Sequence, residues 1–214
     1  MIGAGGLGSA AALALAAAGV ERLGLADADT VALSNLQRQV LYQKADIGLS
    51  KVAQSQHHLS QRQPGLTIRT HPIRLEGVAG ISEVAEGYRV IIDGSDNFAT
   101  RFAANDAALA LNRPLVHGAV VRFQGQVMSV VPGSSPCLRC LFGAPPPVAG
   151  GSCVDEGVLG PMAGELGWLM AMEAVKLLRG EGKPLLGRLL TIDGLRGIRR
   201  EVPFRKHPRC PACS

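Results

Sequence analysis

Met-Ile-Gly-Ala-Gly-Gly-Leu-Gly occupies residues 1–8 and decides the fold that the sequence predicts. Gly3, Gly5 and Gly8 fit the G-x-G-x-x-G spacing. In that pattern the glycines allow a tight turn and a close approach to phosphate, and N–H groups at the start of the next helix face the anion. The Ala/Leu-rich stretch 9–18 predicts this helix. The stretch therefore indicates a nucleotide-binding loop.

The residues on either side of this loop complete the pattern only in part. The apolar run 23–26 predicts a strand, and Asp27 and Asp29 close it where the fingerprint places a ribose-binding carboxylate. Only Met1 and Ile2 precede the glycines, whereas the central strand of such a sheet needs about five residues. We therefore expect the natural chain to start upstream.

Length and composition indicate one globular domain over residues 1–214, with a nucleotide-binding half of about 1–118 and a second half of about 119–214. The chain is 47% hydrophobic, and no uncharged apolar run is long enough to span a membrane. No export signal is visible, so we expect a cytoplasmic protein. The net charge of +5 is modest and aromatic residues make up only 4%, which argues against a nucleic-acid partner.

The order of the expected elements predicts an α/β fold. It is a Rossmann-like doubly wound sheet, parallel in its first half and antiparallel in its second. A loop or short helix is expected at 30–39, and Ser50 is expected to cap the second helix. A hairpin is expected over 122–131, turning about Gly125, and a mobile loop over 143–152. The other expected helices cover 51–62, 78–86, 98–111 and 160–178, and the other strands 66–71, 90–92, 115–118, 189–192 and 198–202.

Four of the five cysteines form two C-x-x-C pairs, at Cys137/Cys140 and Cys210/Cys213. In a chain without an export signal, this spacing favours metal over disulfides. Four thiolates would complete a closed tetrahedral zinc site with no open position for water, which predicts a structural role. The alternative is two unrelated reduced pairs. Cys153 follows the expected mobile loop and is either a functional thiol or a spare one.

A second group of polar residues favours cleavage of a triphosphate. Arg38 and Lys51 follow the second expected strand, and Asp96 follows another. Two cations could stabilise the charge that builds on leaving pyrophosphate, and a carboxylate could hold Mg²⁺. A dehydrogenase has little use for this combination. Asn35 and Asn97 belong to the same polar set.

Several motifs together resemble the MoeB/ThiF group of ubiquitin-activating-enzyme-like adenylyltransferases over essentially the whole chain. They are the glycine loop at 3–8, Leu-Ala-Asp-Ala-Asp at 25–29, Ser-Asn-Leu-Gln-Arg-Gln at 34–39, Gly-Leu-Ser-Lys at 48–51, Asp-Gly-Ser-Asp-Asn at 93–97, the two C-x-x-C pairs and Ala-Met-Glu-Ala-Val-Lys at 171–176. The resemblance implies that ATP and Mg²⁺ bind together with a ubiquitin-like sulfur-carrier protein. The C-terminal Gly-Gly carboxylate of the carrier would attack the α-phosphate, giving an acyl-adenylate and pyrophosphate.

The resemblance also implies roles for individual residues. Gly6 would approach the phosphates, Asp27 would bind ribose, and Asp96 would be linked to Mg²⁺. Arg38 and Lys51 would be phosphate cations. The nucleotide would further be lined by Ser34, Asn35, Leu36, Gln37 and Asn97. Structural zinc would be held by Cys137, Cys140, Cys210 and Cys213. Cys153 matches a cysteine that links covalently to the carrier in some members of the group.

The resemblance implies a homodimer and a separate sulfur donor, in molybdopterin, thiamine or related biosynthesis. It also implies some further residues before the glycine loop. Two other hypotheses remain open at this point. One is an NAD-dependent oxidoreductase that uses the same glycine loop, and the other is a non-catalytic paralogue that binds a carrier. His117, in an apolar strand, is expected to be a core residue.

Overall fold

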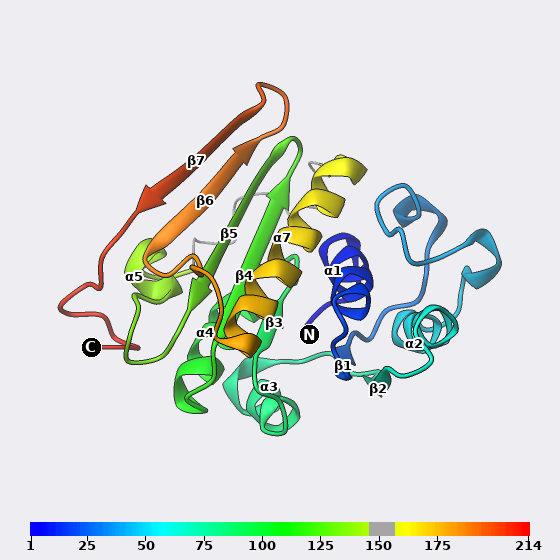
Figure 1. Ribbon diagram of the computed structural model, residues 1–214, viewed down its shortest axis with the longest axis horizontal. Helices are drawn as coiled ribbons and strands as arrows, with labels where there is room; N and C mark the ends of the chain where they lie inside the picture. Colours follow the sequence, from blue (N-terminus) through cyan, green and yellow to red (C-terminus); the bar gives the residue numbers. More distant parts are fainter. Residues whose placement is uncertain (146–156) are drawn as a thin grey trace.

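The computed structural model describes residues 1–145 and 157–214 and contains a mixed sheet with helices on both faces (Figure 1). Two strands pair in parallel at one side, and five more follow in the order β3-β4-β5-β6-β7, of which only β3 and β4 are parallel. The predicted Rossmann-like α/β class is confirmed. The strands are β1 (Arg22–Ala26), β2 (Thr67–His71), β3 (Ile91–Asp93), β4 (Leu115–Val121), β5 (Gln124–Val130), β6 (Arg188–Asp193) and β7 (Ile198–Pro203).

Ile2 joins the two groups of strands. It forms parallel bridges with Ala26 at the end of β1 and with Asp93 at the end of β3. Its N–H donates to Ile92 O at 2.8 Å, and the N–H of Gly3 donates to Ala26 O at 2.8 Å. The first residues therefore occupy the central strand position and lead directly into the glycine loop, as the fingerprint requires.

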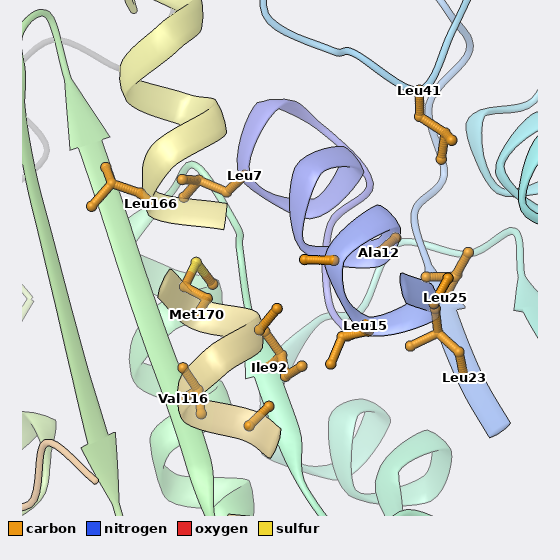
Figure 2. Packing of buried hydrophobic residues seen from close by; sticks show 14 of the residues in the cluster. Leu7, Ala12, Leu15, Leu23, Leu25, Leu41, Ile92, Val116, Leu166 and Met170 are labelled. Atoms are coloured by element: carbon orange, nitrogen blue, oxygen red, sulfur yellow. The ribbon is translucent and has the colours of Figure 1, made fainter. Parts of the chain in front are cut away.

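Side chains that alternate along the strands pack against helices on opposite faces of the sheet. Ile92 and Val116 point to the face covered by α1 and α7, where Leu166 and Met170 pack (Figure 2). Their neighbours along the strands belong to a second apolar cluster, which includes side chains of α3 and α4. The helices are α1 (Gly6–Ala17), α2 (Lys51–Arg62), α3 (Gly77–Ala85), α4 (Phe98–Ala110), α5 (Leu138–Phe142) and α7 (Gly160–Arg179), with short 3₁₀ helices at Leu33–Asn35 and Lys44–Asp46.

α1 and α7 pack closely, and a glycine permits the approach. A Cβ at Gly167 would lie 2.6 Å from Leu7 O and 2.7 Å from the Ala10 side chain. α1 is apolar on all sides and most of it is buried. Because α1 starts at the glycine loop, this contact fixes where the helix N-terminus points.

The predicted antiparallel hairpin is present, but the predicted position of its turn was wrong. β4 and β5 pair in antiparallel fashion from Leu115 opposite Val130 to Val121 opposite Gln124, so the chain turns at 122–123. Arg122 has φ 51°, the left-handed conformation that such a turn requires. Gly125 instead lies inside β5, where a Cβ would be 2.2 Å from the Leu166 side chain. The glycine makes room for α7 rather than for a turn.

Other predictions were correct in outline. Helix α2 starts where expected, but the Ser50 side chain accepts no capping hydrogen bond there. Most of the expected mobile loop 143–152 lies outside the described residues. α7 is a helix of 20 residues, and among the described helices none is long and apolar enough to cross a membrane.

Candidate nucleotide site and metal centre

The glycine loop is held in a shape that only glycine fits. Gly3 has φ +84°, and a Cβ on it would lie 2.9 Å from Gly94 O. A Cβ on Gly8 would lie 2.0 Å from Gly3 O. No hydrogen bond is found from the N–H of Gly5 or Gly6 to any part of the chain that the structure describes. These donors, at the positive end of α1, are available to an anion.

Asp27 connects the end of β1 to this loop. Its Oδ2 accepts from Ala4 N at 2.8 Å, and its Oδ1 accepts from Asp29 N at 2.8 Å. Lys51, at the start of α2, is buried and places its Nζ 2.7 Å from Asp29 and 4.0 Å from Asp27. The structure therefore brings Asp27 and Lys51 together beside the loop, although the sequence separates them by a long crossover segment.

Arg38 lies against the first turn of α1. Its Cγ and its carbonyl oxygen are each 3.5 Å from the position that a Cβ on Gly6 would take. Its guanidinium donates to Asn35 Oδ1 at 2.6 Å and to Ser34 O at 3.4 Å. The 3₁₀ helix Leu33–Asn35 thus orients the Arg38 side chain. Leu36 is half-buried, and the carbonyl of Gln37 rests against Gly160 at the start of α7.

Asp96 and Asn97 follow β3 on the loop that packs against Gly3 and Leu7 through Gly94. Asn97 caps α4, accepting from Thr100 N at 2.9 Å, so its side-chain oxygen already has a structural partner. Asp96 is exposed and forms no hydrogen bond or ion pair with any residue in the described ranges. The structure shows no contact between Asp96 and Arg38 or Lys51.

A buried polar network holds the loop that follows β3. Asp93 accepts from Ser95 N at 3.0 Å and lies 2.8 Å from His117 Nδ1. Burial opposes ionisation of Asp93, but the bonds from His117 and Ser95 outweigh it and hold the pKa of this carboxyl below its usual value. His117 is therefore a hydrogen-bonded core residue, as predicted.

Two buried residues near the loop were not predicted from the sequence. Tyr42 donates its hydroxyl proton to Ala4 O at 2.7 Å. Gln39 is only 3% exposed, and its Nε2 lies 3.7 Å from the Cβ position of Gly5. Its Oε1 has no hydrogen-bond partner within residues 1–145 and 157–214. Gln39 ends the Ser-Asn-Leu-Gln-Arg-Gln motif at 34–39, but the sequence predicted no role for it. Tyr42 follows three residues later, and only its position near that motif could have drawn attention to it.

The four paired cysteines meet at one place. Their Sγ atoms all lie within 4.8 Å of one another, with 3.9 Å between Cys137 and Cys140, 3.6 Å between Cys137 and Cys210, and 3.4 Å between Cys140 and Cys213. Tetrahedral zinc with Zn–S bonds of about 2.3 Å requires sulfurs about 3.8 Å apart. The cluster therefore fits a metal of this type, and the two pairs lie side by side in the fold.

The thiols of the cluster do not titrate alike, because burial raises the pKa of the Cys137 thiol and of the Cys213 thiol. Burial opposes ionisation of Cys210, but backbone N–H groups of Ala212 and Cys213 outweigh it and lower the pKa of the thiol to about 7. A thiolate is the form that binds zinc. The cluster links α5 to the C-terminal tail. Cys153, the other cysteine singled out in the sequence, lies outside the described residues.

Comparison with known families and proteins gives a consistent result. The sequence pattern of the ThiF family matches residues 1–212. The chain is 43% identical to the "Sulfur carrier protein adenylyltransferase" of Thermus thermophilus, covering 100% of this chain and 80% of that protein. It is 42% identical to the "Adenylyltransferase and sulfurtransferase MOCS3" of Anopheles gambiae, covering 100% of this chain but 49% of that one. This chain thus spans about half the length of the second relative.

Among solved structures, E. coli MccB with ATP has the same fold. The TM-score is 0.86 with 21% identity, and the match covers 100% of this chain and 65% of MccB. At this identity the similarity supports the arrangement of helices and strands.

Proposed function

The chain belongs to the ThiF family, and on this premise we propose that it adenylylates the C-terminal Gly-Gly carboxylate of a ubiquitin-like sulfur-carrier protein with ATP, releasing pyrophosphate. Relatives that carry the name adenylyltransferase are nucleotidyltransferases, and they match all of this chain. Their names favour nucleotidyl transfer over the NAD-dependent hypothesis.

One observation carries the proposal: two cationic side chains, Arg38 and Lys51, flank a glycine loop in which the N–H groups of Gly5 and Gly6 have no partner among the described residues. A carboxylate and a triphosphate repel each other, so adenylylation depends on alignment and on neutralised charge. In our proposal Gly6 approaches the phosphates and Asp27 binds the ribose. Arg38 clamps phosphate oxygens, and Lys51 supplies the second cation.

The remaining predicted residues have narrower roles. Asp96 has an exposed carboxylate with no described partner, which suits the Mg²⁺ that accompanies ATP. When bound, that ion would neutralise charge on the phosphates. Asn97 adds a neighbouring contact, and the nucleotide is further lined by Ser34, Asn35, Leu36 and Gln37. Zinc held by the four paired cysteines would be structural, since four thiolates leave no open position.

The wider biology follows from the same proposal. The carrier is of the MoaD or ThiS type, and the pathway makes molybdopterin, thiamine or a related sulfur-containing product. The half of about residues 119–214 contributes the carrier-binding surface. A separate protein supplies sulfur, and the enzyme acts as a homodimer. Cys153 is a candidate for a covalent link to the carrier.

Carrier-dependent exchange between ATP and labelled pyrophosphate tests the proposal. We expect exchange in the wild type and a loss of about 10- to 100-fold in Arg38→Ala, because a charge-assisted bond to phosphate is worth about 1.5–3 kcal/mol. Arg62→Ala is the matched control, since Arg62 is exposed at the end of α2 and away from the loop. Binding of NAD without exchange would support the oxidoreductase instead. Carrier binding without exchange would support the non-catalytic paralogue.

A further inference from the structure

We propose that Tyr42 is a positioning residue of the nucleotide site, whose hydroxyl fixes the orientation of the Ala4–Gly5 peptide in the glycine loop. This inference rests on the proposed function, because it assumes that the loop binds the phosphates of ATP. Tyr42 lies in the segment between β1 and α2 and is only 7% exposed.

Both polar atoms of Ala4 are held by side chains. Its N–H donates to Asp27 Oδ2 at 2.8 Å, and its carbonyl accepts from the Tyr42 hydroxyl at 2.7 Å. In a planar trans peptide the carbonyl and the following N–H point in opposite directions. A carbonyl of Ala4 that is fixed toward Tyr42 therefore directs the N–H of Gly5 away from Tyr42. That N–H has no acceptor in the described part of the chain.

The hydrogen-bond directions around Tyr42 can be assigned. The carbonyl of Ala4 can only accept, so the single hydroxyl proton of Tyr42 is donated there. Ser55 Oγ, 2.9 Å away in α2, must then donate to Tyr42. Burial raises the pKa of Tyr42, which keeps the hydroxyl protonated and able to donate. Ser55 is one turn after Lys51, so the same chain of bonds connects the loop to the helix that carries the proposed second cation.

Gly5 makes this anchor necessary. Glycine has no side chain that restricts its backbone, and Gly5 adopts φ −78° and ψ −146° directly before α1. Without the bond from Tyr42, the Ala4 carbonyl would be buried without that donor, and the peptide would be free to rotate. Such a rotation would turn the Gly5 N–H away from the anion without unfolding the sheet.

The test compares Tyr42→Phe with Tyr88→Phe. The chain has two tyrosines, and Tyr88 packs against Gly24 with its hydroxyl 3.3 Å from His71 Nε2. Tyr88 thus contacts β1 and β2 rather than the loop. We expect Tyr42→Phe to raise the KM for ATP about tenfold, which is the size of one buried hydrogen bond, with the KM for the carrier unchanged. Tyr88→Phe should leave the KM for ATP within twofold of the wild type.

Thermal melting separates positioning from a merely structural role. If Tyr42 only supports the fold, Tyr42→Phe melts earlier while the folded protein binds Mg-ATP with wild-type affinity, and this result would overturn the inference. If the wild type binds no Mg-ATP at all, the proposed function and the inference both fall. A wild type that binds and exchanges normally, with Tyr42→Phe equal to it, overturns the inference alone.

A measurement on the wild-type sequence covers the case in which Tyr42→Phe does not fold. Protein labelled with 3-fluorotyrosine has two ¹⁹F resonances, one per tyrosine, and Tyr88→Phe identifies which is which. We expect Mg-ATP to shift the Tyr42 resonance and to leave that of Tyr88 in place. A Tyr42 resonance that does not move at saturating Mg-ATP contradicts the inference.

Discussion

Substitution of Gly167 by alanine should separate the helix that carries the glycine loop from its neighbour. The new Cβ would lie 2.6 Å from Leu7 O, 2.7 Å from Ala10 Cβ and 2.9 Å from Ala11 N. Two of these atoms are backbone atoms of α1, so no rotation of a side chain relieves the clash. Helices α1 and α7 must move apart by roughly 1 Å, and overpacking of this kind costs about 1–3 kcal/mol.

Gly164→Ala is the matched control, because the same change one turn earlier in α7 meets nothing within 4 Å. Alanine favours a helix over glycine by about 1 kcal/mol, so this variant should gain stability of that order. Gly167→Ala gains the same helix preference, so we expect the two variants to differ by the overpacking cost alone, about 1–3 kcal/mol in the free energy of unfolding. Urea unfolding followed by circular dichroism measures that difference.

The functional consequence can be measured on the same proteins. Because α1 begins at the loop, its displacement should raise the KM for ATP in Gly167→Ala and not in Gly164→Ala. The packing described here would be refuted if the two variants unfolded at the same urea concentration. Equal stability would mean that α1 and α7 are not in contact at Gly167.

Three further predictions concern other parts of the molecule. Cys210→Ser removes one of the four clustered sulfurs, so the zinc content measured after dialysis should fall from one per chain toward zero, and the melting temperature should drop. One zinc per chain in this variant would contradict the proposed zinc site. The pKa of Asp93 is held below its ordinary value of 3.8, so the contribution of this carboxyl to stability is present above pH 3.8 and is lost as the pH falls through the folded-state pKa. Urea unfolding in acid should therefore depend less on pH in Asp93→Asn than in the wild type. An unchanged pH dependence would argue against the His117 bond. Gly8→Ala places a Cβ 2.0 Å from Gly3 O, which should lower the free energy of unfolding by about 1–3 kcal/mol and weaken the binding of ATP. In Gly5→Ala the new Cβ lies 3.7 Å from its nearest neighbour, so this variant should melt like the wild type. Melting of both variants at one temperature would count against the described loop shape.

Local patterns in the sequence predicted most of the fold. The glycine loop, the start of α2 and the alternating strands follow from rules that act over a few residues. Gly125 was misjudged because the reason for it is Leu166, which approaches from α7 and is distant in sequence. A glycine that makes room for another element cannot be told from a turn glycine by local pattern.

The candidate site was predictable in a similar way. Cysteine spacing alone predicted that Cys137 and Cys210 would meet, and the structure confirms it. The bond from Tyr42 to Ala4 could not be foreseen, since it joins two residues whose proximity depends on the path of the segment between β1 and α2. The roles of Arg38 and Asp96 remain predictions that biochemistry must test.

Mass spectrometry of the carrier tests the central claim most directly. The protein is incubated with Mg-ATP and a MoaD-type carrier ending in Gly-Gly, next to a carrier that lacks those two glycines. We predict that the first carrier gains the mass of one AMP, that one pyrophosphate is released for each carrier modified, and that hydroxylamine removes the AMP. Consumption of ATP with no AMP on the carrier, or the same modification of the shortened carrier, would contradict the account.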